Sequence, residues 1–330
     1  MARTGCTAAA VPADLNPAWA TDIGGRLSAP VIAEDRVYVA SIDNHTVHAV
    51  DASRGEMLWQ FTAGGRVDSP PTYWQGRILF GSADGCVYCL RASDGQLAWR
   101  FQAAPVDQRL MSFEQLESVW PVHGSVLIVD DELHFVAGRS MFLDGGLRYY
   151  RLHPETGAVL SETVMDENDP DSEAKLQDYS RQHNMPVAFP DVLSTDGRLI
   201  YMRSQPLRKD GTRLPLEALP YGGNPERYSV QPTQQPEHAH IFSPTGFLDD
   251  SWWHRTYWIY GNYHASGHSG YTQAGAQGAP AGRMITFDKD RIYTWGRLRW
   301  YFKWSEEYVY HLHAKDYDYQ DQWSVMLPIL

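Results

Sequence analysis

The chain has few cysteines, no long apolar run and a deficit of basic residues. Three cysteines in 330 residues are too few for a disulfide framework. No stretch reaches the roughly 18 consecutive apolar residues that a membrane-spanning helix needs. Lys and Arg number 28 against 40 Asp and Glu, giving a net charge of -12, and the basic residues are scattered. An acidic chain without a basic stripe is a poor candidate for binding a nucleic-acid backbone.

Common catalytic signatures are also missing. The sequence holds no glycine-rich dinucleotide loop after a strand, no Walker loop, no HExxH and no GxSxG. Cys86 and Cys89 have the spacing of a metal or redox pair, but their neighbours predict a strand, on which residues three apart face opposite sides. No second pair completes a four-ligand site. We therefore interpret both as buried structural cysteines and expect no metal.

The two ends of the chain resemble cut ends. Residues 1–18 contain one Arg but lack the apolar core of a signal peptide, so we interpret them as a lead-in segment. The last residues, WSVMLPIL, resemble the opening of another repeat unit. We expect the chain to be a fragment of a longer protein.

What the chain does have is a repeat of about 40 residues. Trp19, Trp59 and Trp99 are spaced 40 residues apart, and so are Gly55 and Gly95. The same shift relates the pairs Gly24/Gly64, Gly25/Gly65, Arg26/Arg66, Pro30/Pro70 and Val47/Val87. A period of this length with a recurring Trp and a turn Gly is typical of radial β-repeats, in which each unit is a four-stranded blade.

The segments between turns support this interpretation. Runs such as RVYVAS and TVHAVD alternate or stay apolar and are rich in β-branched and aromatic residues, as strands require. We expect an all-β protein whose residues 19–330 form one β-propeller domain of about five blades, an arc of a larger ring of seven or eight. The expected blades are 19–59, 60–99, 118–161, 185–250 and 251–322, with 323–330 opening another. An insertion before the third blade, VDQRLMSFEQLE, is long enough for a short helix.

The pattern Asp51, Gly55, Trp59, loosely repeated at Gly95 and Trp99, resembles the tryptophan-docking motif of the PQQ-like β-propeller repeat family. That superfamily includes quinoprotein alcohol dehydrogenases and BamB-like proteins. Longer stretches such as QLESVWPVHGS and DDSWWHRTYWIYG are similar to large bacterial, planctomycete-type PQQ-binding-like repeat proteins. The resemblance implies an extracytoplasmic location, in the periplasm or cell envelope, although no signal peptide is visible in this chain.

The resemblance also frames the cofactor question. The enzymes of the superfamily hold pyrroloquinoline quinone (PQQ) between a Trp face and a disulfide of adjacent cysteines, beside a metal ion. This chain has no adjacent cysteine pair, and the metal ligands and base cannot be placed by motif. We therefore expect no cofactor and assign no catalytic residue. PQQ with calcium belongs to the alternative hypothesis of a quinoprotein-type oxidoreductase.

The repeated tryptophans are interpreted as structural. A residue that recurs once per blade serves the interface between blades, where a large aromatic fills the gap and its N–H finds a carbonyl. We assign this blade-docking role to six residues: Trp19, Trp59, Trp99, Gly55, Gly95 and Gly157.

Three groups of residues are candidates for binding. Arg26 and Arg66 follow Gly-Gly just before the strand expected nearest the axis, where they would line a channel and bind an anion, or stay solvated at a turn. A second group breaks the repeat beside the insertion, as a grafted site would, although Arg139 and Asp144 could equally pair across a strand connection. Its members are Glu117, Trp120, His123, Arg139 and Asp144.

The third group is the densest aromatic run of the chain. On a strand, Trp253 and Arg255 share one face and His254 lies on the other. Such a face would stack on a glycan, a quinone or a peptide, or it would simply be buried.

Three functions follow from these patterns. The first is a non-enzymatic scaffold that binds protein partners or the remaining blades of a longer chain. The alternatives are part of a quinoprotein-type oxidoreductase and a glycan-binding propeller. Whether the protein is an enzyme is left open, with the absence of a catalytic set favouring a non-enzyme.

Overall fold

The computed structural model describes residues 14–112, 114–168, 170–171, 175, 192–202, 205–215, 240–242, 258–261, 281–282, 284–288, 291–297 and 310–316. Over these ranges the chain is all-β and no helix is present, so none is available to cross a bilayer. The chain divides into two compact units, Ala9–Asp166 and Glu167–Leu330, which are described separately.

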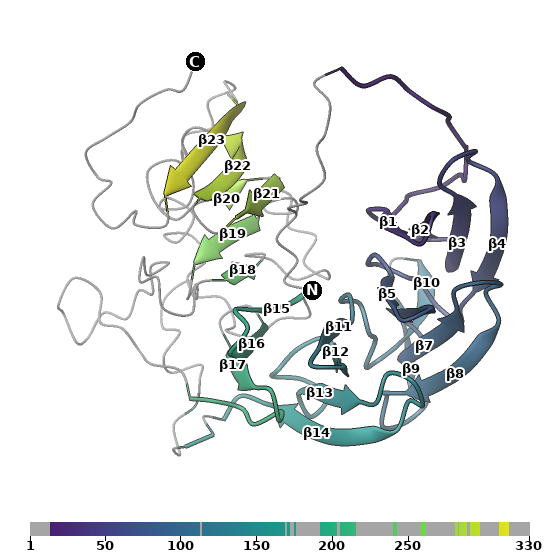
Figure 1. Ribbon diagram of the computed structural model, residues 1–330. Coiled ribbons are helices and arrows are strands. Elements are labelled where there is room, and N and C mark those ends of the chain that lie inside the picture. The colour runs from purple at the N-terminus through teal and green to yellow at the C-terminus, as the bar shows by residue number, and fades with distance from the viewer. Residues whose placement is uncertain are drawn as a thin grey trace. The chain divides into compact units, whose positions relative to one another are not determined.

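The first unit contains three four-stranded antiparallel sheets, each a simple meander in chain order. Figure 1 shows these sheets side by side, with the fourth strands β4, β8 and β14 along the outer edge of the unit. The sheets are β1 (Val31–Ala33), β2 (Arg36–Ser41), β3 (Thr46–Asp51) and β4 (Met57–Thr62); β5 (Thr72–Trp74), β6 (Arg77–Gly81), β7 (Cys86–Arg91) and β8 (Leu97–Gln102); and β11 (Leu127–Val129), β12 (Glu132–Ala137), β13 (Leu147–Leu152) and β14 (Val159–Met165).

Four-stranded meanders packed face to face are the blades of a β-propeller. The two apolar cores of the unit each join one blade to the next. One core contains Tyr38 and Trp59 of the first blade together with Phe80 and Tyr88 of the second. The other contains Leu79 of the second blade with Phe135 and Tyr150 of the third. Each blade therefore completes its neighbour's core, and the predicted all-β propeller fold is confirmed.

The two cysteines of β7 illustrate this alternation. Cys86 belongs to the core between the first and second blades, and Cys89 to the core between the second and third. Both are free and buried, and burial raises the pKa of each thiol to about 12. The two sulfurs point to opposite faces of one strand, so they cannot grip a single ion.

The turn before β4 is built by the motif seen in the sequence. Asp51 Oδ1 accepts hydrogen bonds from the backbone N–H groups of Ser53 and Arg54, each at 2.9 Å. The Ser53 hydroxyl, which also donates to Asp51, and these two backbone bonds lower the pKa of Asp51 to about 2. Gly55 then adopts φ +72°, a left-handed conformation that favours glycine.

A tryptophan packs on the turn glycine of the following blade. A Cβ on Gly95 would lie 2.6 Å from the Trp59 ring, and the Trp59 indole N–H donates to the carbonyl of Ala92 at 2.9 Å. Trp19 and Trp99 repeat this contact. Their rings lie 2.6 Å and 2.9 Å from a Cβ on Gly55 and Gly157, and their indoles bond Ala52 O at 2.9 Å and Pro154 O at 3.1 Å. The absent side chain of each glycine is what leaves room for the indole.

The insertion before the third blade forms a β-hairpin, so the short helix suggested for it is wrong. β9 (Arg109–Ser112) pairs antiparallel with β10 (Gln115–Ser118) in a separate two-stranded sheet. Burial alternates along β9 and over the first three residues of β10, which is the period of a β-strand and accounts for the hairpin. The side chains of Leu110 and Glu117 are turned inward, and those of Met111 and Leu116 are turned outward.

The second unit holds three three-stranded sheets among its described residues. The sheet β18–β20 spans the blade boundary expected at residue 250, because β18 pairs with β19 across it. Strands that follow each other in the chain are usually neighbours in a sheet, and β18 and β19 are an example. The sheets are β15 (Leu193–Thr195), β16 (Leu199–Met202) and β17 (Gln205–Arg208); β18 (His240–Phe242), β19 (Trp258–Gly261) and β20 (Ala281–Gly282); and β21 (Met284–Phe287), β22 (Arg291–Arg297) and β23 (Tyr310–Asp316).

Candidate functional site

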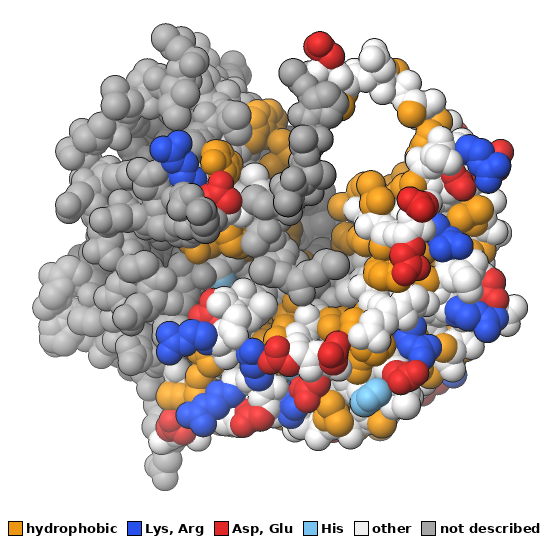
Figure 2. Space-filling model, in the orientation of Figure 1, with side chains coloured by type: hydrophobic (Ala, Val, Ile, Leu, Met, Phe, Trp, Pro, Cys, Tyr) orange, Lys and Arg blue, Asp and Glu red, His pale blue; other side chains and the backbone are white. Residues whose placement is uncertain are grey.

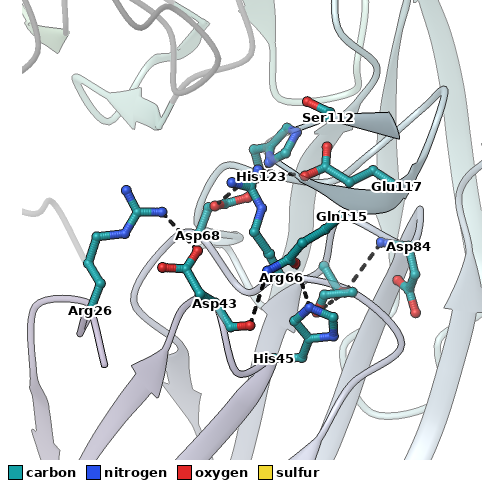
Figure 3. A network of polar contacts seen from close by, with 12 residues as sticks. Arg26, Asp43, His45, Arg66, Asp68, Asp84, Ser112, Gln115, Glu117 and His123 are labelled. Atoms are coloured by element: carbon teal, nitrogen blue, oxygen red, sulfur yellow. Dashed lines mark hydrogen bonds and ion pairs between the residues drawn. The ribbon is translucent and has the colours of Figure 1, made fainter. Parts of the chain in front are cut away.

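A network of charged side chains joins the second and third blades to the β9–β10 hairpin (Figure 3). Arg66 comes from the loop that leads into β5, and Glu117 from β10. Arg139 follows β12, and His123 lies in the loop before β11. Two separate groups of sequence candidates, the repeated arginine and the residues beside the insertion, are thus brought together in space.

Glu117 is the centre of this network. Its Oε1 lies 2.7 Å from Nη2 of Arg66, and its Oε2 pairs with Nη2 of Arg139. Nη1 of Arg139 donates to the hydroxyl of Ser112 at 3.4 Å, which links the third blade to β9. The Glu117 side chain is fully buried, and a buried carboxylate needs such partners because water cannot solvate it.

Asp68 provides the second carboxylate. Its Oδ1 lies 3.5 Å from Nη2 of Arg66, and its Oδ2 pairs with Nδ1 of His123. Burial raises the pKa of Asp68, but the neighbouring His123 and Arg66 outweigh burial and hold that pKa below its usual value. Two carboxylates therefore face two guanidinium groups and one imidazole, and their charges are largely balanced within the network.

The hairpin is also tied to the first blade. His45, in the loop between β2 and β3, donates from Nε2 to Oε1 of Gln115 at 2.6 Å. The Gln115 amide donates in turn to the backbone carbonyl of Asp43 at 3.2 Å. Through Gln115 and Glu117, strand β10 is fastened to loops of all three blades of the first unit (Figure 3).

The other candidates of the first unit lie at the edge of this network or outside it (Figure 3). Arg26 pairs with Asp43 at 3.1 Å, and its side chain is 60% exposed. The indole of Trp120 donates to the backbone carbonyl of Asp144 at 3.1 Å. Arg139 pairs with Glu117 rather than with Asp144, because β10 brings a buried carboxylate closer. Trp120 and Asp144 thus contact each other but are not members of the ion network.

Sequence reasoning missed several partners of this network. Asp68 breaks the 40-residue repeat, since Ser28 occupies the equivalent position, and that break was the available signal. Gln115 and His45 gave no such signal, because their pairing depends on how the hairpin folds over the first blade. Of the sequence candidates, Trp253, His254 and Arg255 lie outside the described residues.

The described residues do not fit a quinone clamp. Cys86 and Cys89 lie on opposite faces of β7, and the rings of Trp59 and Trp99 pack on Gly95 and Gly157. No group of three or more His, Cys, Asp or Glu residues that could hold a metal occurs in the described part of the chain. The buried charges of this site serve one another instead.

Comparison with known proteins shows the family to which the chain belongs. The family model described as outer membrane protein assembly factor BamB matches residues 3–185, more than half of the chain. No curated protein sequence matches.

Several solved structures resemble the chain at low identity. BamB from Moraxella catarrhalis is 14% identical, with 81% of this chain and 68% of that chain covered and a TM-score of 0.45. Quinohemoprotein alcohol dehydrogenase from Comamonas testosteroni is 14% identical, with 82% and 51% covered and a TM-score of 0.48. A europium-containing methanol dehydrogenase is 21% identical, with 47% and 28% covered and a TM-score of 0.37. The chain thus spans 28% of the length of that methanol dehydrogenase and about half of the alcohol dehydrogenase.

Proposed function

Because the chain belongs to the family described as outer membrane protein assembly factor BamB, we propose that it is a non-enzymatic β-propeller module that binds protein outside the cytoplasm. Its partners are other proteins or further blades of a longer chain. The periplasm or cell envelope is the location that this family implies.

The main support for the proposal is that the buried charged side chains pair with one another. Arg66, Glu117 and Arg139 neutralise one another and fasten an insertion onto the blades. A catalytic site keeps at least one group free to act on a substrate, and its perturbed groups converge on a cleft. Here the charged groups are joined to each other at the base of a hairpin, which is how a rigid platform for an interaction loop is built.

A redox assay separates this function from the quinoprotein-type oxidoreductase. The purified chain is supplied with PQQ and calcium, and reduction of an electron-acceptor dye is followed across a panel of primary alcohols and sugars. We expect no dye reduction above the level without protein and no tight PQQ binding by calorimetry. Substrate-dependent dye reduction would overturn the scaffold function.

Site-specific photo-crosslinking tests the binding role itself. A photoreactive amino acid is placed at exposed positions of the first unit, and irradiation is carried out in native cells. We expect defined crosslinked partners from at least one surface of the unit. A uniform absence of crosslinks from every exposed position would contradict a binding function.

A further inference from the structure

The β9–β10 hairpin presents two apolar side chains to solvent. Met111 and Leu116 are opposite each other in the register and are 66% and 58% exposed. The opposite face of the ribbon carries Glu117, which is buried in the ion network. The hairpin therefore has one face anchored to the blades and one apolar face turned outward.

The alternation of hydrogen-bonded and non-hydrogen-bonded residue pairs along the hairpin shows which backbone groups point outward. The N–H of Val119 donates to the carbonyl of Gln108 at 2.9 Å, so 108 and 119 form a hydrogen-bonded pair. Such pairs alternate with non-hydrogen-bonded pairs along an antiparallel ribbon. Met111 and Leu116 therefore form a non-hydrogen-bonded pair, whose side chains are closest and whose N–H and C=O groups point outward from the ribbon.

The two outer edges of the ribbon are not equivalent. On the β10 side, the N–H of Ser118 donates to the carbonyl of Ala83 at 2.8 Å, and Gln115 is bonded to the first blade. That edge faces the body of the unit. In the described part of the chain β9 pairs with no strand except β10, so its outer edge offers the backbone groups of Arg109 and Met111 to another strand.

We propose that the outer edge of β9 binds an extended segment of a partner protein, which adds as a third strand and places an apolar side chain over Met111 and Leu116. Backbone hydrogen bonds would supply affinity and the apolar pair specificity. This inference rests on the proposed function and names the surface that performs it.

Charge selects the partner's chemistry. The chain carries a net charge of -12, and exposed Glu114 follows β9, while Asp107, just before β9, pairs with Arg109 of that strand at 3.0 Å. Acidic residues attract a cationic partner and repel an anionic one. The partner segment is therefore an apolar strand flanked by Lys or Arg, and a second copy of this acidic chain is disfavoured. Figure 2 shows acidic and basic side chains interspersed over the visible surface of the first unit, with no single large charged patch on it.

Synthetic peptides provide the probe. We would measure the binding of an eight-residue peptide of alternating Val and Lys to the full chain by fluorescence anisotropy, at low salt. The comparison peptides alternate Val and Glu, or carry N-methylated backbone amides. We expect the Val–Lys peptide to bind, and the other two to bind at least about tenfold more weakly because each loses charge or backbone complementarity.

Two proline variants separate the two edges. Met111→Pro removes an outward N–H on β9, and Leu116→Pro removes the matching N–H on β10, while neither interrupts the hydrogen bonds within the hairpin. Met111→Pro is expected to abolish binding, whereas Leu116→Pro weakens it only a few-fold through the lost side chain. Should either proline unfold the hairpin, the test uses Met111→Ser, with Leu97→Ser on β8 as a control at another exposed apolar residue. We expect Met111→Ser to lose about tenfold in affinity and Leu97→Ser to lose none.

Several results would overturn the inference. They are failure of the Val–Lys peptide to bind, equal binding of the N-methylated peptide, tighter binding of the Val–Glu peptide, or unchanged affinity in Met111→Pro and Met111→Ser. A self-association that Met111→Ser abolishes, seen by sedimentation, would make a second copy the occupant and would also overturn it.

Photo-crosslinking distinguishes failure of this inference from failure of the proposed function. The photoreactive residue is placed at 111 and 116, and separately at 97 and 159 on the outer strands. Crosslinks at 111 and 116 support the hairpin as the docking surface. Crosslinks at 97 or 159 alone would refute the hairpin but leave the binding function intact.

Discussion

The first two blades begin from the same pattern and end in different environments. Arg26 and Arg66 occupy equivalent positions, and each backbone carbonyl accepts the same bond, from Ile42 and Ala83 at 2.8 Å. The Arg26 side chain is 60% exposed and meets one exposed carboxylate, whereas the Arg66 side chain is 3% exposed and meets two buried ones. The backbone is repeated, but the energetic role of the arginine is not.

The difference comes from residues that the two blades do not share. Glu117 arrives with the hairpin insertion and Asp68 replaces the Ser28 of the first blade. The tryptophan contacts diverge in the same way, since Trp19 is 36% exposed and Trp59 is 8% exposed in matching sockets. The repeat therefore sets the backbone position of a side chain, and the elements packed over that side chain decide how far it is buried and how much it stabilises the fold.

Removing the central carboxylate should break the comparison most strongly. Glu117→Ala leaves the buried Arg66 and the partly buried Arg139 without their main partner, which costs about 3–5 kcal/mol of unfolding free energy. The exposed equivalent, Asp43→Ala, should cost less than about 1 kcal/mol. Urea unfolding of both variants measures the contrast, and similar small losses would show that burial does not distinguish the two arginines.

The tryptophan sockets should differ less. Trp59→Ala removes a buried indole and its hydrogen bond to Ala92, for a loss of about 3–5 kcal/mol. Trp19→Ala removes a partly exposed indole and should cost about 1–2 kcal/mol. Thermal and urea denaturation report both, and a larger loss for Trp19→Ala would reverse the ranking of the two sockets.

The glycine under Trp59 offers a sharper control inside the second blade. Gly95 and Gly76 have φ of +72° and +74°, so alanine at either carries the same backbone strain of about 1–2 kcal/mol. Only at Gly95 does the new Cβ meet an indole, whereas at Gly76 nothing lies within 4 Å. Gly95→Ala should therefore lose a further 1–3 kcal/mol or so through overpacking, and equal losses in denaturant melts would remove the docking role of Gly95.

The smallest effect is a pH dependence carried by Asp68. Its pKa in the folded chain lies below the unfolded value, so its carboxylate stabilises the fold at neutral pH. That contribution is lost as pH falls from about 4 through the lowered pKa. The stability difference between the wild type and Asp68→Asn should shrink over this range. Ser28→Ala, at the matching position of the first blade, should show no comparable change, and a pH-independent gap for Asp68→Asn would refute the assignment.

The strands of the first unit could be predicted because their signals are local. Alternation in RVYVAS and the Asp51–Gly55 turn depend on residues close in sequence, and β2, β3 and the turn follow them. The candidate site could be predicted only in part. Arg66 and Glu117 are recognisable, but their pairing requires knowing that 106–117 folds as a hairpin, and that segment carries no repeat.

Arg26 and Arg66 show the limit most clearly. The sequence treats them alike because they share one repeat position. Their burial differs because Glu117 pairs with Arg66 and not with Arg26, and the proximity of residues about 50 apart is set by tertiary packing. In the second unit, the pairing of β18 with β19 likewise joins residues on either side of position 250, across a segment without repeat character.

The packing of each indole on a glycine allows insertions of different length between the two residues. Trp19 and Trp59 each engage a glycine 36 positions ahead, but Trp99 skips over the hairpin to engage Gly157, 58 positions ahead, with the same fit. The contact between indole and glycine therefore does not depend on how many residues separate the two in the chain. The connection after β8 is thus a site at which a further segment can be inserted, in evolution or by protein engineering, without disturbing the packing of the blades on either side.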